Sequence, residues 1–434
     1  MTRFAAFRAP NEILFGPGHV ASLAPVAARL GSRAYVCTDA RLVADPRIAR
    51  ALRDLAGAGL RVEIDDSTQP ELPADQVAAS VAKARRHRPD VVVGIGGGSC
   101  LDLAKVVAAL VTHGGEATDY HGESRVPGPV IPVVAVPTTA GTGSEVTPVA
   151  VLGHPERTTK VGMSSRFLIP TVAICDPELT ESCPPGLTAA AGADALAHAV
   201  EAFTAVVQPD DSHLARRRVF VGKNPLTDQL ALFAAGLVAR HLPRAVAAPD
   251  PAAREGMMLA ALAAGLAFGT AGTAAAHALQ YPVGAFTGTS HGVGVGLLLP
   301  YVMAFNRPAR AADLAALAAT LRAARAPREE GDTDDRLAED LVADLLAEVG
   351  IPATLAALGM PEDKLVWAAE EAMRATRLVE NNPRRLDRDA ALAILRAAHA
   401  GDRARLSDLA DGPVPAGDAR PTELAADRPA RSRS

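Results

Sequence analysis

The sequence predicts an α/β domain built on a parallel sheet, followed by a second domain made of helices. Three observations support this fold class. The first part of the chain, about 180 residues, alternates apolar runs with helical stretches, which is typical of a parallel sheet whose strands are joined by helices. Residues 181–186 then contain two consecutive prolines, which stop regular structure and indicate a hinge. Beyond this hinge the pattern is almost entirely that of Ala- and Leu-rich helices.

The α/β domain is predicted to span residues 1–183 and the helical domain residues 184–410. Within the first domain, apolar runs predict strands at residues 34–38, 61–64, 90–95, 130–136 and 171–174. Helical stretches lie between them, among them residues 74–87 and 101–111. Residues 411–434 are rich in Pro, Asp and Arg, so this tail is predicted to be disordered.

The composition of the chain excludes several classes of protein. Apolar residues make up 49% and charged residues 21% of the 434 residues, which is the composition of a globular protein. The formal net charge of −5 offers no basic surface for nucleic acid. Four cysteines without a CxxC pair argue against a disulfide scaffold, and the N-terminus has no apolar run of signal-peptide length. We therefore expect a cytoplasmic protein.

Four side chains in the second half of the chain are candidates for a metal site. Asp194 and His198 stand four residues apart in a helical pattern, so they project from one face. His277 and His291 lie within a run, residues 257–306, that contains no Asp, Glu, Lys or Arg. One carboxylate and three imidazoles form a complete ligand set for a divalent transition metal. A structural contact between Asp194 and His198 is the alternative.

Residues 257–285 of this uncharged run are long enough to cross a bilayer. Several glycines and Pro282 interrupt it, and it holds His277. Neither Trp and Tyr belts nor clusters of Lys and Arg frame the run, as they would frame a span. We therefore expect helices packed in the core, and no membrane partner.

A glycine-rich turn in the first domain is a candidate phosphate site. Residues 91–95 form an apolar strand that runs into Gly96, Gly97, Gly98 and Ser99, and a helix follows from residue 101. Glycines let backbone N–H groups approach a pyrophosphate, and a helix N-terminus favours the anion. Ser99 is placed to cap that helix. The spacing differs from the GxGxxG fingerprint, so a plain tight turn is the alternative.

Two further features of this domain suit a dinucleotide. The loop 137–147 follows a strand and carries Thr138, Thr139 and Thr142, whose hydroxyls can bond a ribose or a phosphate. Asp39 ends the strand 34–38, a position from which a carboxylate bonds a ribose hydroxyl and repels a 2′-phosphate. Asp39 therefore favours NAD over NADP. An ordinary Thr-rich loop and a turn-capping Asp are the alternatives.

The chain resembles the iron-containing, or group III, alcohol dehydrogenases. Their motifs match GGGSCLDLAK (96–105), PTTAGTGSE (137–145), DPELT (176–180), GADALAHAVE (192–201), His277, and SHGV (290–293) leading into LLLP (297–300). The order and spacing of these motifs agree over about residues 10–400. The resemblance implies a dehydroquinate synthase-like fold: an N-terminal dinucleotide-binding α/β domain and an all-α C-terminal domain, with the metal in the cleft between them.

The resemblance also implies roles for individual residues. Asp194, His198, His277 and His291 would bind Fe²⁺, with Zn²⁺ as the alternative because the two metals share these ligands. A site with four protein ligands leaves room for substrate only if coordination expands, which suits Fe²⁺ better than Zn²⁺. Contacts to NAD(H) would come from Asp39, Gly96, Gly97, Gly98, Ser99, Thr138, Thr139, Thr142, Val151, Lys160 and Leu179.

The implied activity is that of an NAD(H)- and metal-dependent alcohol dehydrogenase or aldehyde reductase. Such an oxidoreductase transfers a hydride between the nicotinamide and a small alcohol or aldehyde. The chain departs from many family members at Tyr281, where they carry a second histidine four residues after the third ligand. Its hydroxyl can bond the substrate oxygen, which makes Tyr281 the candidate catalytic residue. An ordinary pKa of about 10 makes it a poor base at neutral pH.

Other features leave the substrate open. Tyr281-Pro282, residues 164–166 and residues 221–225 look like the hydroxyacid–oxoacid transhydrogenase branch, so Arg166 and Lys223 are candidates for holding an acidic group. The alternative functions are therefore reduction of an acidic aldehyde, such as phosphonoacetaldehyde or succinic semialdehyde, or a transhydrogenase. A lyase of the dehydroquinate synthase type is less favoured, because the motifs are the dehydrogenase versions. We also expect a homo-oligomer, a dimer.

Overall fold

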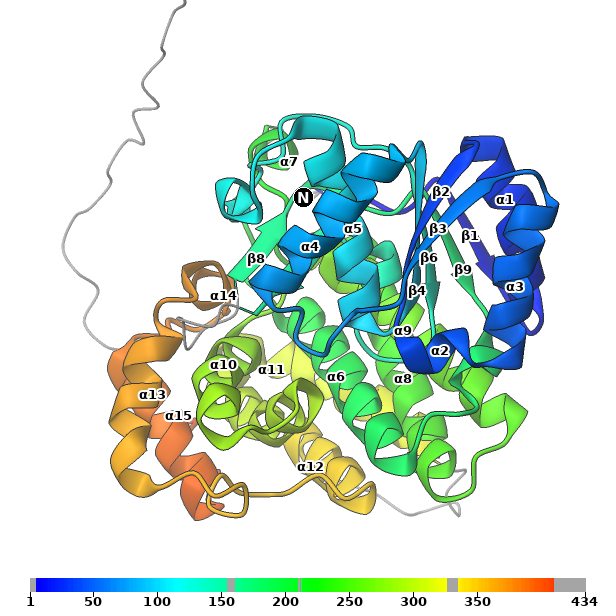
Figure 1. Cartoon of the computed structure of the whole chain (residues 1–434). Helices are drawn as coiled ribbons and strands as arrows, with labels where there is room; N and C mark the ends of the chain where they lie inside the picture. The colour runs from blue at the N-terminus through cyan, green and yellow to red at the C-terminus, as the bar shows by residue number, and fades with distance from the viewer. Residues whose placement is uncertain (1–4, 154–160, 210, 212, 326–334, 410–434) are drawn as a thin grey trace, which may run out of the picture.

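The computed structural model describes residues 5–153, 161–209, 211, 213–325 and 335–409. A parallel sheet flanked by helices stands beside a mass of helices (Figure 1). This arrangement confirms the predicted fold class. The predicted disordered tail, residues 411–434, lies outside the described residues.

The main sheet has six parallel strands, and the five predicted strands are all present. Their order is β1 (Glu12–Phe15), β9 (Val172–Cys175), β6 (Val133–Pro137), β4 (Val91–Gly96), β2 (Arg33–Cys37) and β3 (Arg61–Asp65). Strand β1 was not predicted, because it is only four residues long and pairs with β9, far away in the chain. Strand β6 begins three residues later than expected, directly after Pro132, which lacks the N–H that a strand needs.

Helices cover both faces of this sheet (Figure 1). One face packs on η1 (His19–Ser22), α1 (Leu23–Leu30) and α3 (Pro46–Gly57), and the other on α4 (Ala74–His87) and α5 (Gly98–His113). Successive residues of β4 therefore face different helices: Val91 and Val93 join the first layer, and Val92 joins the second. Burial on both faces explains why β4 is a continuous apolar run.

A crevice follows from the order of the strands. The chain passes from β2 outward to β3 and then returns to the other side of β2 as β4. At such a switch point the connections leave in opposite directions, and ligands bind at the carboxyl ends of the strands. Here those ends are Asp39 after β2 and Gly97 after β4.

Shorter elements complete the domain: α2 (Ala40–Val43), η2 (Ala117–Tyr120), β5 (Gly122–Glu123), η3 (Ser144–Val146), β7 (Val149–Leu152), β8 (Val161–Ser164), η4 (Arg166–Leu168) and η5 (Pro177–Thr180).

The helical domain begins at the second of the two consecutive prolines. Pro185 occupies the first turn of α6, where a missing N–H leaves no hydrogen bond unmade. Helix α6 lies against α8, α9 and α11, and its small Ala and Gly residues allow close approach. The elements are α6 (Pro185–Thr204), α7 (Leu214–Arg217), α8 (Pro225–Ala247), α9 (Pro251–Ala271), α10 (Ala275–Thr287), α11 (His291–Arg325), α12 (Ala338–Glu348), η6 (Glu362–Lys364), α13 (Leu365–Ala372), α14 (Thr376–Glu380) and α15 (Arg388–Ala400).

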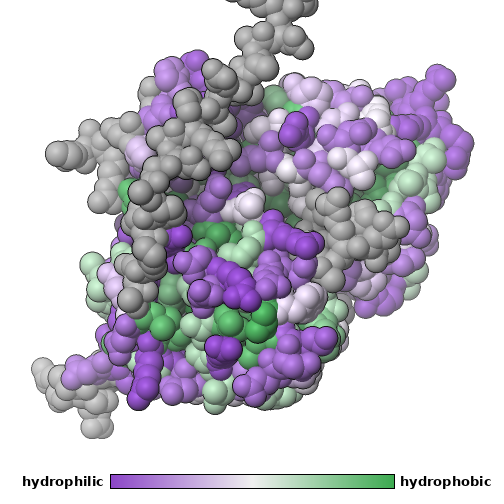
Figure 2. Space-filling view, turned by 90° about the vertical axis from the view of Figure 1, so that its left-hand side faces the viewer, coloured by the Kyte–Doolittle hydropathy of each residue, from purple (hydrophilic) through white to green (hydrophobic). Residues whose placement is uncertain are grey.

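Two parts of this domain are long and apolar enough to cross a membrane by length and composition. Helix α8 meets these criteria alone, and α9 and α10 meet them together, although a 105° bend separates them. In the fold, α8 and α9 pack on each other and on α6 in the helical core. Figure 2 shows the face on the left of Figure 1, where apolar side chains gather over the lower, helical part among hydrophilic ones.

The two domains touch through a pair of glycines. Gly143, before η3, adopts a left-handed φ of 61°, and Gly265 of α9 lies against it. A Cβ on Gly265 would lie 2.9 Å from the Cα of Gly143 and 2.8 Å from Val146 Cγ2. Met258 and Leu262 of α9 extend this contact onto β9. Only glycine therefore lets α9 approach the α/β domain this closely.

We expect Gly265→Ala to destabilise the protein by about 1–3 kcal/mol, because the added methyl group has backbone as its neighbour and cannot be accommodated without a shift. Urea unfolding measures the difference. Gly186→Ala is the matched control, since a Cβ at Gly186 in the first turn of α6 would meet no atom within 4 Å. Equal stability of the two variants would contradict the proposed close packing.

Candidate metal centre and cofactor cleft

Three imidazoles converge on one carboxylate oxygen. The Nε2 atoms of His198, His277 and His291 lie 3.6, 3.7 and 3.6 Å from Oδ1 of Asp194. Asp194, His198 and His277 are at most 5% exposed, and His291 is half-buried. One ligand atom from each of Asp194, His277 and His291 lies within 4.8 Å of the others, and the His198 ring stacks on His277 at 4.9 Å between centroids. The structure thus brings all four predicted ligands together.

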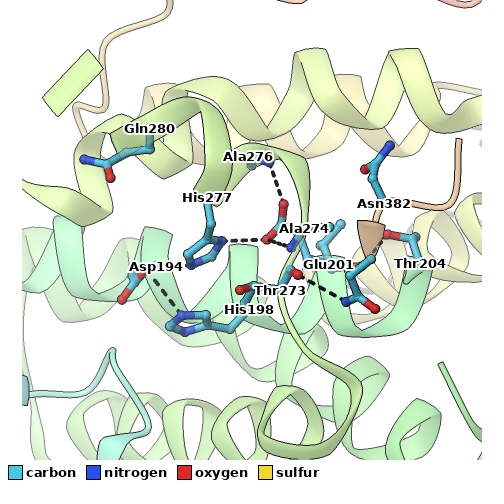
Figure 3. Close-up of polar contacts among 12 residues, drawn as sticks. Asp194, His198, Glu201, Thr204, Thr273, Ala274, Ala276, His277, Gln280 and Asn382 are labelled. Atoms are coloured by element: carbon cyan, nitrogen blue, oxygen red, sulfur yellow. Dashed lines mark hydrogen bonds and ion pairs between the residues drawn. The ribbon is translucent and has the colours of Figure 1, made fainter. Parts of the chain in front are cut away.

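Three helices supply these side chains. Asp194 and His198 project from one face of α6, as their spacing predicts, and His277 approaches them from α10 (Figure 3). His291 is the first residue of α11. Its neighbour Gly292 makes this possible, because a Cβ there would lie 2.0 Å from the carbonyl oxygen of Ala190 in α6. The start of α11 therefore rests directly on the backbone of α6.

A buried carboxylate fixes the orientation of His277. Glu201 Oε2 lies 2.6 Å from His277 Nδ1 and also accepts a hydrogen bond from the N–H of Ala274, while Oε1 accepts one from Ala276 (Figure 3). Burial raises the pKa of Glu201, but the His277 ring and these N–H groups lower it more, so the carboxylate is ionised. Nδ1–H of His277 then donates to Glu201, and the lone pair of Nε2 faces Asp194.

A hydrogen bond and burial also prepare the other two rings as ligands. Nδ1 of His291 lies 2.7 Å from Oε1 of Gln280, an acceptor, so this nitrogen carries the proton and Nε2 holds the lone pair. Burial lowers the pKa of His198 to about 4, so its ring is neutral at neutral pH.

The residues fit a divalent metal. The Nε2 atom of His277 is buried and has no hydrogen-bond partner among the described residues, an arrangement that is costly unless a ligand satisfies it. Imidazole nitrogens and a carboxylate are donors for Fe²⁺ and Zn²⁺. Partners on the far nitrogens of the rings, such as Glu201 and Gln280, are the usual support of such sites.

A cleft of about 780 Å³ runs from this centre to the glycine-rich turn, a size that suits a ligand-binding site. The metal-site residues and Tyr281 line it at one end. Eight of the predicted cofactor residues also line it: Asp39, Gly97, Gly98, Ser99, Thr138, Thr139, Thr142 and Val151. Gly96 and Leu179 do not; Gly96 forms the turn itself, with a φ of 151°, and Leu179 packs in the core. Lys160 lies outside the described residues.

The glycine-rich turn presents a helix N-terminus to the cleft. Gly97 is the N-cap of α5 and the helix begins at Gly98, so the expectation that Ser99 caps it is wrong. A Cβ on Gly98 would lie 2.8 Å from Thr142 Cγ2, which shows that the two predicted cofactor loops touch. Backbone N–H groups at the start of a 16-residue helix form a site for an anionic phosphate.

A buried lysine ties the Thr-rich loop to α5. Lys105 is fully buried and donates to Ser144 Oγ at 2.8 Å and to the carbonyl of Val149 at 2.7 Å. Asp102, one turn earlier, accepts from Ser144 Oγ at 2.6 Å and from the N–H of Val151 at 2.9 Å. Burial lowers the pKa of Lys105 to about 8. This network fixes the Thr-rich loop against α5, the helix that begins at the glycine-rich turn.

Asp39 both caps a helix and lines the cleft. Its carboxylate caps α2, accepting from the N–H groups of Arg41 and Leu42 at 2.9 and 3.2 Å, which is the turn-capping alternative. It also lines the cleft, at the carboxyl end of β2 beside the switch point. A carboxylate at this position remains suited to a ribose hydroxyl.

Comparison with known proteins identifies the family to which the chain belongs. Residues 10–177 match the model described as iron-containing alcohol dehydrogenase, and residues 188–399 match the model of the C-terminal domain of that family. The chain is 38% identical to long-chain-alcohol dehydrogenase 1 of Geobacillus thermodenitrificans, over 89% of this chain and 94% of the relative. The chain belongs to the iron-containing alcohol dehydrogenase family. It is therefore an oxidoreductase.

Solved structures of the family have the same fold as this chain. A 1,3-propanediol oxidoreductase superposes with a TM-score of 0.82 at 33% identity, covering 91% of this chain and all of that one. A sulfoacetaldehyde reductase from Bifidobacterium kashiwanohense in complex with NAD⁺ superposes with a TM-score of 0.77 at 30% identity, covering 92% and all of that chain. The predicted resemblance to iron-containing alcohol dehydrogenases is thus confirmed.

Two predicted substrate residues of this alcohol dehydrogenase lie away from the cleft. Lys223 is buried, with its Nζ 2.9 Å from Asp228 and 3.4 Å from Asp313, and it donates to the carbonyl of Phe203 at 2.7 Å. Arg166 is exposed and lies over the ring of Phe167. Neither lines the cleft, so their positions do not support binding of a substrate in it.

Other residues of the site had no predicted role. Glu201 and Gln280 orient ligands, and Arg377 lines the cleft beside Tyr281. A signal for the first two does exist in the sequence. Glu201 follows His198 by three residues and Gln280 follows His277 by three, so each shares a helix face with a ligand.

Glu145, next to Ser144, gives the fold a pH dependence. Its side chain is 1% exposed, and burial raises its pKa from 4.5 to about 7, with Lys105 opposing. Between these values the folded state holds a proton that the unfolded state releases, so stability falls as pH rises. We expect the stability of Glu145→Gln relative to wild type to rise by about 2 kcal/mol between pH 4.5 and 7, because glutamine does not ionise. Urea unfolding at several pH values measures it; a constant difference would contradict it.

Proposed function

We propose that this iron-containing alcohol dehydrogenase interconverts a small aldehyde and its alcohol with NAD(H) as the redox cofactor and Fe²⁺ in the metal centre. The observation that carries the proposal is the convergence of three imidazoles on Asp194 in the same cleft as the start of α5. The sulfoacetaldehyde reductase that superposes on this chain binds NAD⁺, which supports the cofactor. Zn²⁺ is the alternative metal because it accepts the same donors.

The cofactor would lie across the switch point of the sheet. Its pyrophosphate would sit at the N–H groups of Gly97 and Gly98, and its adenine-side ribose beside Asp39. The nicotinamide would then lie toward the metal-centre end of the cleft, and NAD(H), when bound, would supply or accept the hydride. Asp39 would repel a 2′-phosphate, which supports NAD(H) over NADP(H).

At the metal centre, Asp194 and the three histidines would hold the ion, which when bound supplies Lewis-acid polarisation of the substrate oxygen. Glu201 keeps the proton of His277 on Nδ1, and Gln280 keeps that of His291 on Nδ1. Both rings therefore retain their lone pairs on Nε2. Phe268 stacks on His198 at 4.1 Å and contributes to the apolar wall that excludes water.

Tyr281 would touch the substrate. It lines the cleft, and its ring lies 6.1 Å from that of His291. Burial raises the pKa of Tyr281 above its ordinary value, with Arg377 opposing, so the phenol keeps its proton at neutral pH. Tyr281 therefore donates a hydrogen bond to the substrate oxygen and orients it. It does not serve as a general base.

The test uses metal-free protein reconstituted without oxygen. NADH absorbance is followed with propanal after addition of Fe²⁺, Zn²⁺ or no metal, and with NADPH in place of NADH. The proposal expects turnover with Fe²⁺ and NADH, loss on chelation, and a preference for NADH over NADPH. Full activity of the metal-free protein would overturn the metal requirement. The proposed small-molecule metabolism also fits a cytoplasmic location, which four free thiols support.

A further inference from the structure

Arg377 is a cation of the cleft that the proposed function leaves without a role. It lies on α14 and lines the cleft at the metal-centre end, together with Tyr281 and Phe220. Among the described residues that line the cleft, the other arginine is Arg41, which is paired with Asp39 at the cofactor end. Arg377 is therefore the cation available to the substrate end of the cleft.

The guanidinium of Arg377 is held in place by an aromatic ring. Its Cζ lies 4.3 Å from the centroid of Phe220, a stacking contact that fixes the plane of the group. Phe220 is itself fixed, because its N–H donates to Glu123 Oε1 at 3.2 Å and its side chain is 5% exposed. The ring holds the cation but accepts no hydrogen bond from the edges of the guanidinium.

One edge of Arg377 lacks a partner. Its Nη1 atom is buried and donates no hydrogen bond, and no carboxylate among the described residues forms an ion pair with it. The nearby carboxylates are engaged elsewhere: Glu201 binds His277, Ala274 and Ala276, and Glu123 binds Val219 and Phe220. An unpaired buried donor on a cation is costly, so the arrangement favours an incoming anion.

A buried arginine with a purely structural role looks different in this chain. Arg384 also stacks on a ring, that of Phe305 at 4.5 Å. Its Nη atoms, however, donate to the carbonyl oxygens of Phe305, Leu406 and Leu409. Backbone carbonyl oxygens thus accept hydrogen bonds from the Nη atoms of Arg384 in the core, whereas Nη1 of Arg377 in the cleft has no such acceptor among the described residues. The open Nη1 atom therefore separates Arg377 from Arg384.

We propose that Arg377 binds an oxyanion on the substrate, so that this enzyme prefers short aldehydes that carry a carboxylate, sulfonate or phosphonate. The assignment rests on the proposed function, since it places the aldehyde oxygen at the metal centre. Tyr281 connects the metal centre with the lining around Arg377: its ring lies 6.1 Å from that of His291, and it lines the cleft together with Arg377. Arg166 and Lys223, outside the cleft, do not provide this contact.

The test compares matched aldehydes in wild type, Arg377→Leu, Arg377→Lys and Arg374→Leu. Succinic semialdehyde is paired with butanal, and sulfoacetaldehyde and phosphonoacetaldehyde with propanal. Arg374 is the control because it is exposed on the same segment, pairs with Glu371 and does not line the cleft. We expect kcat/KM for the anionic aldehydes to fall about 100-fold in Arg377→Leu, since a charge-assisted hydrogen bond is lost. Neutral aldehydes and the KM for NADH should change less than about 3-fold.

The lysine variant and a binding measurement complete the test. Arg377→Lys should recover part of the preference for anions, because lysine keeps the charge but loses the planar pair of donors. Calorimetry with succinate on the protein loaded with NAD⁺ and metal should show binding that weakens at least about 10-fold in Arg377→Leu. Circular dichroism checks that each variant is folded.

The outcomes separate the two proposals. Equal kcat/KM for charged and neutral aldehydes in wild type would overturn the role of Arg377, and so would an equal loss on both classes in Arg377→Leu. An affinity for succinate that is the same in wild type and Arg377→Leu would also overturn the role of Arg377. If no aldehyde oxidises NADH but succinate binding depends on Arg377, the proposed function fails and the anion site stands.

Discussion

Asp194→Ala should lower kcat/KM for aldehyde reduction by about 10³-fold or more and leave the protein without stoichiometric metal. The reason is geometric: all three imidazole Nε2 atoms lie 3.6–3.7 Å from its Oδ1, so the carboxylate is the centre of the donor set and its anionic member. Polarisation of a carbonyl by a bound metal contributes several kcal/mol to catalysis, which sets the size of the loss. Elemental analysis and NADH absorbance measure the two effects.

A control separates this effect from a general loss of structure. Asp389, at the start of α15, is exposed and pairs with Arg388, so Asp389→Ala should keep metal content and activity. The thermal midpoint of Asp194→Ala should also be compared with that of metal-free wild type. An Asp194→Ala protein that retains iron and turns over normally would show that the donor set has been placed wrongly.

Glu201→Gln should weaken Fe²⁺ binding by about 10- to 100-fold, although Glu201 does not face the metal. The carboxylate accepts three hydrogen bonds, from His277 Nδ1 and from the N–H groups of Ala274 and Ala276. Glutamine offers one acceptor oxygen, and its amide N–H groups would face donors. His277 would then lose the group that keeps its proton on Nδ1 and its lone pair on Nε2.

Competition with a chelator measures the affinity of Glu201→Gln for Fe²⁺. Activity lost at limiting iron should return with excess iron, which a merely unfolded protein would not show. Glu380→Gln is the control, since Glu380 is an exposed carboxylate paired with Arg218. Unchanged iron affinity in Glu201→Gln would mean that the ring of His277 is oriented by packing alone.

Local patterns in the sequence were enough to predict most of the fold. The alternation of apolar runs and helices predicted five strands within a few residues, because strands buried on both faces are continuous apolar runs. Strand β1 was missed since EILF, at residues 12–15, is short and gains its place only by pairing with β9. The burial of Lys105 was not predicted, although the residue is fully buried.

The site was predictable only in part, for related reasons. Asp194 and His198 share a helix face, so their pairing follows from spacing. The partnership of Glu201 and His277, 76 residues apart, depends on how α6 and α10 cross. Arg166 and Lys223 were chosen by local resemblance, and the fold turns them away from the cleft. Arg377 enters it from α14, which no local pattern indicates.

We expect Asp194, His198, His277 and His291 to hold one divalent ion together. Anomalous diffraction at the iron edge, from crystals of the protein loaded anaerobically with Fe²⁺, tests it most directly. We expect a single strong peak between Oδ1 of Asp194 and the three Nε2 atoms, which should be absent in crystals of Asp194→Ala. A peak elsewhere in the chain, or none in an active crystal, would contradict it.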